Sequence, residues 1–301
     1  MEIDKELPKN IEHIVINGGG PFILNMYGAL KKSNELKMWE QKNIKTYHGT
    51  SAGAMLCLIL ALNFEWSEMD AFIINCPWSN FIKFNVLEIY NYYFRNGIND
   101  SGFVYGVFTP LFGAKDIDLN ITFAQLHEKL NTDIHVYATS FKTFEIKEFN
   151  KDLTPNVKVL EAIYASTALP LMFNPIKIEE DVYIDGGIFL NYPLAKCLEK
   201  NVDPQTVLGI KNKYCNENFT TKDDMTMFEY ITKLFEMIFS KFQIEPDPNI
   251  KIGIEIRINF NSMTIEKFFE MAKSCNLRKI AIDYGIKDVT DYIAELTNSS
   301  R

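Results

Sequence analysis

The chain has 301 residues, of which 47% are hydrophobic and 23% charged, and it carries 23 Phe and 14 Tyr. This composition excludes a disordered chain, a collagen and a coiled coil, and a chain of this length buries a core without help from disulfides or metals. The net charge of −8, from 31 basic and 39 acidic residues, argues against nucleic-acid binding and against electrostatic attraction to anionic membranes.

Strand and helix signals alternate along most of the chain. In chain order, the pattern predicts a strand over residues 11–17, helix 21–37, strand 44–48, helix 53–62, helix 122–130, strand 134–139, helix 157–165, strands 182–184 and 206–210, helix 225–242, strand 252–258 and helix 265–284. Pro21 suits the first turn of the helix that it opens. Residues 53–62 are nearly all apolar, and so short a run predicts a helix buried on all sides rather than a membrane span.

This alternation predicts an α/β fold. Strands separated by helices favour a mostly parallel central sheet covered by helices on both faces, which gives three layers in the order α/β/α. No repeat, linker or Pro/Gly-rich break divides the chain. We therefore expect one domain over residues 1–301, with residues 211–301 as a C-terminal extension packed on it.

Residues 78–112 differ from the rest because aromatic side chains crowd a stretch with glycines at 97, 102 and 106. The plainer interpretation is an insertion that contributes these aromatic side chains to the core. The alternative is a mobile lid or a wall for an acyl chain, because aromatic rings pack well against lipid and glycines allow a flap to move.

Cysteine spacing and the N-terminal residues indicate the compartment. The five cysteines form neither a CxxC pair nor a Cys/His cluster with zinc spacing, so we expect no disulfide framework and no metal site. Residues 1–10 mix acidic residues with lysines, which predicts neither a signal peptide nor a transit peptide. No apolar run reaches the roughly 18 residues of a membrane span. We expect a cytoplasmic protein or one attached peripherally to a membrane.

The strongest local signal is the GxSxG sequence from Gly49 to Gly53, with Ser51 at its centre. The predicted strand that enters it and the apolar helix that leaves it are typical of a sharp turn that exposes a nucleophilic serine hydroxyl. An ordinary strand–helix turn built from small residues is the alternative.

A nucleophilic serine needs a base, and the sequence offers two kinds. Asp185, followed by Gly186 and Gly187, ends a short apolar strand, where ligands bind in open α/β sheets. An Asx turn, in which the carboxylate caps backbone amides, explains the same pattern. The histidine alternatives are His127 and His135, since no histidine follows position 135.

Gly18, Gly19 and Gly20 follow the first predicted strand and precede a helix. The spacing fits neither a dinucleotide fingerprint nor a phosphate loop. Three residues without side chains let backbone amides converge on an anion, which favours an oxyanion hole for a reaction at Ser51.

The combination resembles the patatin-like phospholipase family, which uses a Ser–Asp dyad without histidine. The matching residues are Gly18–Gly20 as oxyanion loop, Ser51 between Gly49 and Gly53 as nucleophile elbow, and Asp185-Gly186-Gly187 downstream, in the family's order. The resemblance covers roughly residues 11–210. It departs where many relatives carry a basic residue after the glycine run, because this chain has Pro21 and Phe22 there, and proline has no amide hydrogen to donate.

The resemblance implies a patatin-like fold and a lipid acyl hydrolase of phospholipase A type. Ser51 would attack an acyl ester of a phospholipid or a related lipid at a membrane surface, and Asp185 would accept its proton. No cofactor and no metal are implied. A catalytically weak lipid-binding or effector protein on the same fold is the alternative, because the basic residue after Gly20 is missing.

Overall fold

A computed structural model gives the structure of residues 10–81, 97–214, 243–260 and 265–299, together with Tyr230, Leu234, Met237 and Lys241. Its strands are β1 (His13–Ile16), β2 (Thr46–Thr50), β3 (Gly97–Asn99), β4 (Asp133–Ser140), β5 (Ile146–Phe149), β6 (Leu171–Phe173), β7 (Ile176–Ile178), β8 (Asp181–Asp185), β9 (Val207–Tyr214) and β10 (Ile254–Phe260).

The α-helices are α1 (Ile23–Glu35), α2 (Ala52–Ala61), α3 (Trp66–Asn75), α4 (Trp78–Phe81), α6 (Gly102–Ala114), α7 (Phe123–Leu130), α8 (Val159–Thr167), α9 (Leu194–Leu198), α11 (Ile265–Lys273) and α12 (Cys275–Ser299). Short 3₁₀ turns are η1 (Gly20–Phe22), η2 (Gln41–Asn43), η4 (Gly186–Ile188) and η5 (Pro204–Thr206).

The central sheet is mixed, with a parallel part that carries the expected architecture. Strands β10, β9, β1, β2 and β4 are parallel neighbours in that order. Strands β5, β7 and β8 join antiparallel through short connections that the sequence pattern did not reveal. β3 and β6 form a separate two-stranded sheet.

β2 and β8 lie end to end along one edge of β4, and this arrangement places the site. Val136 and Tyr137 of β4 pair with both β2 and β5, whereas Ala138 and Thr139 pair with both β5 and β8. Because a strand has only two edges and β5 occupies one of them, β2 and β8 share the other. The end of β2 at Thr50 therefore faces the end of β8 at Asp185.

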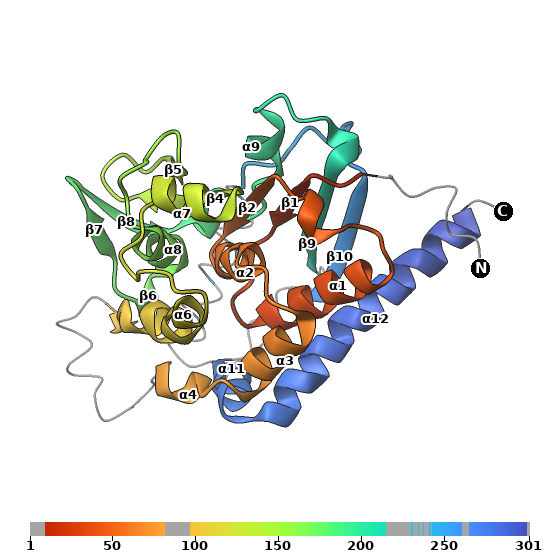
Figure 1. Cartoon of the computed structure of the whole chain (residues 1–301), viewed down its shortest axis with the longest axis horizontal. Helices are drawn as coiled ribbons and strands as arrows, with labels where there is room; N and C mark the ends of the chain where they lie inside the picture. The colour runs from red at the N-terminus through yellow and green to blue at the C-terminus, as the bar shows by residue number, and fades with distance from the viewer. Residues whose placement is uncertain are drawn as a thin grey trace.

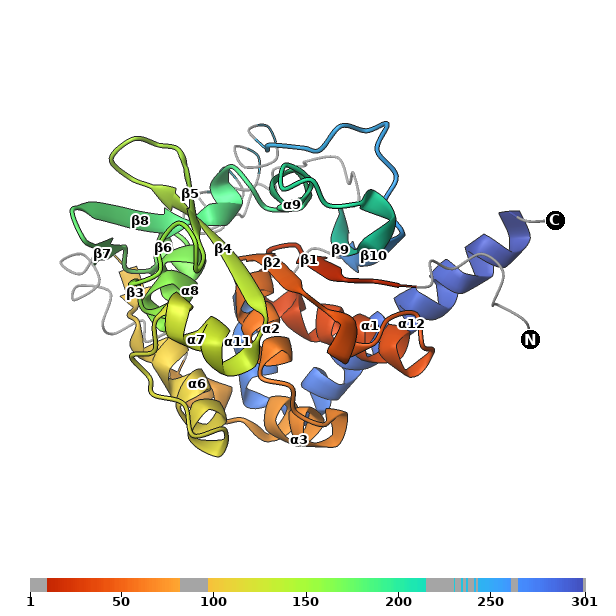
Figure 2. The ribbon, with the colours of Figure 1, turned by 45° about the horizontal axis from the view of Figure 1, so that its top comes forward.

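Helices cover the two faces of the sheet unequally. The side chains of Ile14 and Ile16 join the large core under α1, α2, α8 and α12, whereas Val15 between them joins a small cluster under α9. Figure 2 shows α9 on one side of the strands and α1, α2 and α12 on the other. In Figure 1, α12 runs along α1. The prediction of three layers in the order α/β/α is confirmed, and the layer that contains α9 is the thin one.

Several predicted elements differ in extent. Gly49 does not end the second strand, which continues to Thr50 because β4 pairs with it that far. The predicted helix over 265–284 is two helices, α11 and α12, separated at Ser274, and α12 continues to Ser299. Helix α3 was not predicted, and the predicted helix over 225–242 lies largely outside the described residues.

The described part of the aromatic segment 78–112 forms α4, β3 and α6. Phe103, Phe108 and Phe112 of α6 are buried in the main core, as the plainer interpretation expected. The aromatic residues between 82 and 96 lie outside the described residues, so the lid alternative stays a prediction.

Candidate active site

Ser51 occupies a tight turn between β2 and α2. Its backbone φ of 54° is in the left-handed region that residues with side chains rarely adopt. A Cβ on Gly49 would lie 2.6 Å from the Gly53 carbonyl oxygen, and a Cβ on Gly53 would lie 2.5 Å from the carbonyl oxygens of Ile16 and Asn17. Only glycine allows this close backbone approach, which holds Ser51 at the tip of a nucleophile elbow.

The C-terminal end of α8 anchors this turn. The Ser51 amide donates to Ser166 Oγ over 2.8 Å, and the Ser166 hydroxyl donates onward to the Tyr137 carbonyl oxygen over 2.5 Å. Ser166 is fully buried, so both bonds are shielded from water. Ser166 thereby ties the strained turn to strand β4, a role that was not predicted from the sequence.

The Ser51 hydroxyl donates to the Asp185 carboxylate. Its Oγ lies 2.7 Å from Oδ2, and the Gly187 amide donates to Oδ1 over 2.7 Å. Asp185 is only 5% exposed, and this burial raises its pKa from 3.8 to about 6, although the hydrogen bonds from Ser51 and Gly187 oppose the shift. A carboxylate with a raised pKa in contact with a hydroxyl is suited to act as a general base.

The backbone of Asp185 is also fixed on both sides. Its amide donates to the Ala168 carbonyl oxygen over 3.0 Å, and the Thr139 hydroxyl donates to its carbonyl oxygen over 3.0 Å. A Cβ on Gly186 would lie 2.2 Å from the Tyr137 carbonyl oxygen, so the chain can turn here only with glycine. The Asx turn that was the alternative explanation is present, because the Asp185 carboxylate accepts from the Gly187 amide. The same carboxylate also accepts from the Ser51 hydroxyl.

The glycine loop lies directly against the serine. A Cβ on Gly18 would lie 3.2 Å from Ser51 Cβ and 2.4 Å from Asn191 Oδ1. Of the three glycines predicted to form the oxyanion hole, Gly18 already uses its amide, which donates to the Asn191 carbonyl oxygen over 2.9 Å. Among the residues that the structure describes, none accepts from the amides of Gly19 or Gly20. Gly20 has a φ of +51° at the turn into α1.

Two buried carboxamides fix the peptide that contains the Gly19 amide. Asn17 and Asn212 both donate to the Gly18 carbonyl oxygen, over 2.6 and 2.9 Å, and both are at most 3% exposed. The Gly18 carbonyl and the Gly19 N–H belong to one planar peptide unit and point in opposite directions. Asn17 and Asn212 therefore set the direction of the Gly19 N–H and, by polarising the peptide, strengthen it as a donor.

Gln243 ties the segment after Asp185 to the glycine loop. Its Nε2 donates to the carbonyl oxygens of Gly187 and Ile188 over 3.0 and 3.2 Å. Its Oε1 accepts from the Asn191 amide over 2.8 Å. Since the Asn191 carbonyl holds Gly18, Gln243 links both halves of the site.

The histidines lie away from this constellation. His127 Nδ1 is 2.7 Å from the Asp133 carboxylate, and Asp133 begins β4 at the opposite end from the site. His135 Nδ1 is 2.7 Å from the Glu148 carboxylate, and its ring stacks on His48 with centroids 4.1 Å apart. Burial holds the pKa of His48 well below its usual range. These contacts favour structural roles for both candidate histidines and leave Asp185 as the partner of Ser51.

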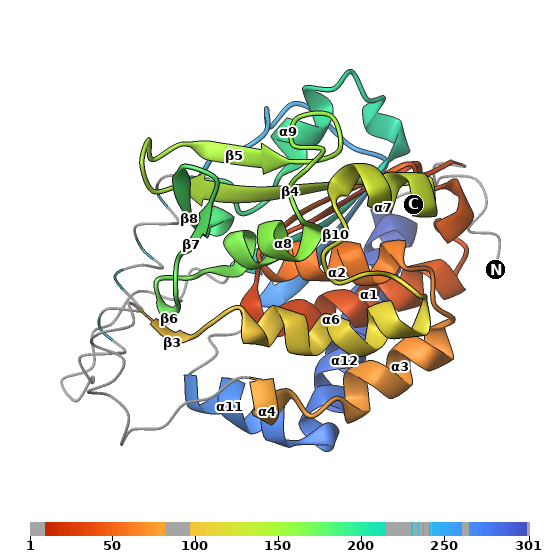
Figure 3. The same ribbon diagram turned by 60° about the vertical axis from the view of Figure 1, so that its left-hand side comes forward.

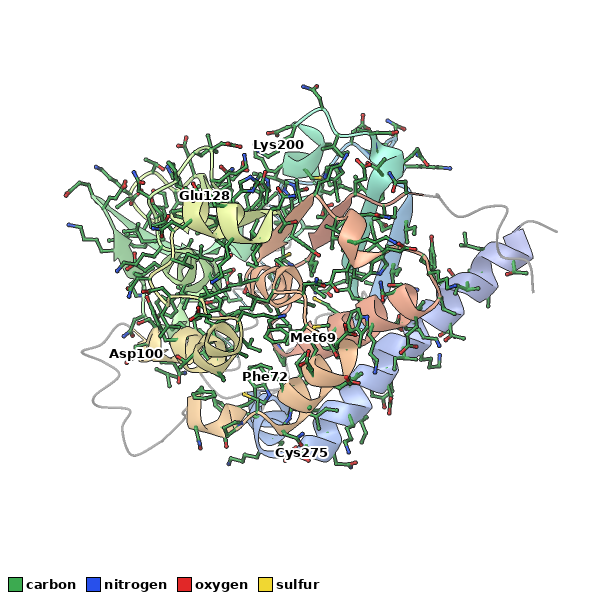
Figure 4. The ribbon with its side chains drawn as sticks, viewed as in Figure 1. Met69, Phe72, Asp100, Glu128, Lys200 and Cys275 are labelled. Carbon is green, nitrogen blue, oxygen red and sulfur yellow. The ribbon has the colours of Figure 1, made fainter. Side chains whose placement is uncertain are left out.

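Glu148 joins this histidine cluster to a surface lysine. Lys200 lies 2.8 Å from the Glu148 carboxylate and follows α9. Figure 4 labels Lys200 beside α9, on the opposite side of the molecule from Cys275.

No group of three or more His, Cys, Asp or Glu side chains suited to a metal ion occurs within the described residues. Over the same part of the chain, the helices are all too short or too polar to cross a bilayer.

The structure thus brings Ser51, Asp185, the loop Gly18–Gly20 and the pair Gly186–Gly187 into one site. The supporting side chains were missed: Asn17, Ser166, Asn191, Asn212 and Gln243. Asn17 precedes the glycine run directly and Ser166 lies in the last turn of α8 among small residues, so both stood beside a recognisable pattern. Asn212 and Gln243 carry no signal, because only the fold brings them to the loop.

Comparisons with known proteins place the chain in a family. The family described as Patatin-like phospholipase matches residues 14–198. A probable lipid hydrolase of Invertebrate iridescent virus 6 is 29% identical over 189 residues, which are 62% of this chain and 63% of that protein, so less than two thirds of that relative is spanned. An uncharacterized protein of Acanthamoeba polyphaga mimivirus is 23% identical over 96% of this chain and 95% of its own length. Among solved structures, VipD from Legionella pneumophila is 14% identical, with a TM-score of 0.48 over 94% of this chain and 67% of that chain.

Proposed function

Because the chain belongs to the patatin-like phospholipase family, we propose that it is a lipid acyl hydrolase that cleaves fatty acyl esters of phospholipids, with Ser51 as nucleophile and Asp185 as base. The observation that carries this proposal is the hydrogen bond of 2.7 Å from Ser51 Oγ to Asp185 Oδ2. The elbow, the buried carboxylate and the glycine loop around that bond are the parts that an acyl transfer needs.

In the first half of the reaction, Ser51 Oγ attacks the ester carbonyl carbon while its proton passes to Asp185 Oδ2. The carbonyl oxygen becomes an oxyanion, for which the amides of Gly19 and Gly20 are the candidate donors. The tetrahedral intermediate collapses, the bond to the alcohol breaks, and the proton on Asp185 passes to the leaving alkoxide. The fatty acyl group stays on Ser51 as an ester.

In the second half, a water molecule attacks the acyl-serine and gives its proton to Asp185. The second tetrahedral intermediate releases the fatty acid, and the proton returns to Ser51 Oγ. Asp185 serves as base and then acid in each half, and its pKa of about 6 lies close enough to neutral pH for both directions of transfer.

The direct test replaces the nucleophile. We expect Ser51→Ala to lower the rate of phospholipid hydrolysis on the order of 10⁶-fold while the circular dichroism spectrum is unchanged. Wild-type protein should react with a fluorophosphonate probe at Ser51, with chelator present. Unchanged turnover by Ser51→Ala would exclude the mechanism.

The alternatives predict different results. A lipid-binding protein without catalysis would bind lipid but leave Ser51 unlabelled by the probe. A histidine-dependent esterase would lose turnover in His127→Ala or His135→Ala, whereas the dyad predicts that neither change removes activity from the folded protein.

A further inference from the structure

The edge of the sheet beside the dyad carries exposed apolar side chains. In the turn between β4 and β5, Phe141 is 61% exposed and Phe144 is 56% exposed. The Phe144 ring packs edge to face against Phe189 with centroids 5.2 Å apart. The amide of Ile244, a residue 41% exposed, donates to the Phe189 carbonyl oxygen over 2.7 Å. We call Phe141, Phe144, Phe189 and Ile244 the apolar tip.

The apolar tip and the dyad lie at the same end of the sheet, the one at which β4 ends. Ala138 of β4 is the partner of Asp185, and β4 continues from there to Ser140 and into the turn. Phe189 follows Asp185 by four residues, across η4. Figure 3 shows β4 and β5 side by side with β8 next to them. Substrates of open α/β sheets bind at the carboxyl ends of the strands, so the apolar tip projects from the same end of the sheet at which the dyad lies.

The turn holds Phe144 in an unfavourable state for a residue in water. Its φ of 60° is in the left-handed region, which bulky side chains rarely adopt. The residue is 56% exposed, so burial in the core does not offset this strain. The hydrogen bonds between Ser140 and residues 144 and 145 close this turn and hold Phe144 outward, so an apolar phase outside the protein would bury its side chain.

We propose that the apolar tip inserts into the surface of a zwitterionic phospholipid bilayer and docks the dyad against its substrate. This inference rests on the proposed function, which requires access to lipid. Aromatic rings favour the boundary between headgroups and acyl chains. The charged residues of the turn, Lys142 and Glu145, cancel, and the chain as a whole carries −8, which repels anionic lipid. The charge therefore favours a neutral, zwitterionic surface.

The test measures binding without catalysis. Ser51→Ala protein is sedimented with sucrose-loaded phosphatidylcholine vesicles, and the same background carries the double change Phe141→Ser and Phe144→Ser. We expect the double variant to lose at least about tenfold in vesicle partitioning. The matched control is Leu153→Ser, because Leu153 is also 61% exposed. The loop that carries Leu153 lies at the other end of β4 from the apolar tip. Lys151 of that loop pairs with Asp133, the first residue of β4, over 3.5 Å.

A second measurement reports insertion directly. Tryptophan placed by Phe144→Trp should be quenched by brominated phosphatidylcholine, and tryptophan placed by Leu153→Trp should not. Equal loss of binding in the Leu153→Ser control, no quenching at position 144, or binding that requires anionic phosphatidylglycerol would each overturn the inference.

The two proposals fail separately. If Ser51→Ala binds vesicles through the apolar tip but wild-type protein hydrolyses no acyl ester, the proposed function is wrong and the docking surface stands. If wild-type protein hydrolyses a monomeric short-chain ester but the tip variants partition onto vesicles as well as Ser51→Ala alone, the docking surface is wrong.

Discussion

Two of the regions in which glycines allow close backbone approaches can be compared directly: the elbow at Ser51 and the crossing of α1 with α12. At the elbow, a Cβ on Gly49 or Gly53 would lie 2.5–2.6 Å from carbonyl oxygens. At the crossing, a Cβ on Gly28 would lie 2.1 Å from the Ile282 carbonyl oxygen, and one on Gly285 would lie 1.8 Å from the Asn25 carbonyl oxygen. The steric requirement is therefore the same in both places.

The neighbours of these glycines differ. The elbow sets a strained serine beside a buried carboxylate, an arrangement that lowers stability and that the proposed function requires for its reactivity. The crossing brings two helices together and buries Ile282 and Val289 of α12 in the main core. Glycine alone does not distinguish a functional turn from a structural contact. The distinction comes from the polar groups that the close approach brings together.

The largest effect is expected where the elbow meets Asp185. Asp185→Asn keeps the shape of the side chain but removes the base, so we expect kcat to fall by about 10³–10⁴-fold. The free energy of unfolding of the Asp185→Asn variant, in contrast, should rise. The folded state raises the pKa of Asp185 from 3.8 to about 6, so at pH 7 the charged carboxylate lowers the free energy of unfolding by on the order of 2–3 kcal/mol.

The destabilisation by the Asp185 carboxylate depends on pH, and this dependence can be measured. The penalty of the buried carboxylate develops as the pH rises from about 4 to 6, because the unfolded chain loses the Asp185 proton first. Urea unfolding should therefore show Asp185→Asn more stable than wild type at pH 7 and similar to it near pH 3.5. A variant that is inactive and less stable at pH 7 would show that Asp185 serves structure rather than chemistry.

At the crossing of α1 with α12, replacing a glycine by a larger residue should lower stability and leave activity unchanged. Gly285→Val forces a side chain into the Asn25 backbone, and we expect a loss of about 3 kcal/mol or more in the free energy of unfolding. The kcat per folded molecule, counted by fluorophosphonate labelling, should stay within about twofold. Loss of kcat in protein that is still folded would connect the crossing to the site.

A matched glycine provides the control for this substitution. Gly113 lies within α6, and a Cβ there would have no atom within 4 Å. Gly113→Ala should therefore stabilise the protein by about 0.5–1 kcal/mol, because alanine loses less conformational freedom in a helix.

The pH dependence of wild-type activity separates the two regions further. The base acts only when Asp185 has lost its proton, so kcat/KM for an uncharged ester should fall about tenfold per pH unit below about pH 6 and level off above it. The profile should be the same in Gly113→Ala, which does not touch the site. A midpoint near 4 in the wild type would mean that Asp185 is not the group that titrates.

The sequence predicted the parts of the site whose chemistry restricts local residue types. Gly49, Gly53 and Gly186 are required by backbone collisions, and Ser51 and Asp185 by the proposed reaction, so each leaves a readable pattern. The parallel strands were also predictable, because β-branched runs alternate with helices. Of the antiparallel strands, only β8 was predicted, over residues 182–184. Strands β5 and β7 are too short to give a clear sequence pattern.

The end-to-end placement of β2 and β8 lay beyond the sequence, because it depends on which edge of β4 each strand occupies. The same holds for Asn212 and Gln243, which reach the site from strand β9 and from the segment before β10. Both lie beyond residue 198, where the family match ends. The chain after that residue therefore supplies contacts to the site that no local pattern records.

Asn212 gives the smallest predicted loss of activity and a sensitive test of that conclusion. Asn212→Leu keeps the branched shape of the side chain but removes the 2.9 Å hydrogen bond to the Gly18 carbonyl, leaving Asn17 as the remaining side-chain donor to that carbonyl within the described residues. If the Gly19 amide stabilises the oxyanion, we expect kcat to fall about three- to tenfold with KM nearly unchanged, because a weakened donor matters most in the transition state. Asn212→Asp should be worse than Asn212→Leu, since a carboxylate beside the Gly18 carbonyl repels it and cannot donate. If both variants change KM and kcat in proportion to a loss of folded protein, Asn212 merely packs the strand, and the Gly18–Gly19 peptide is held without it.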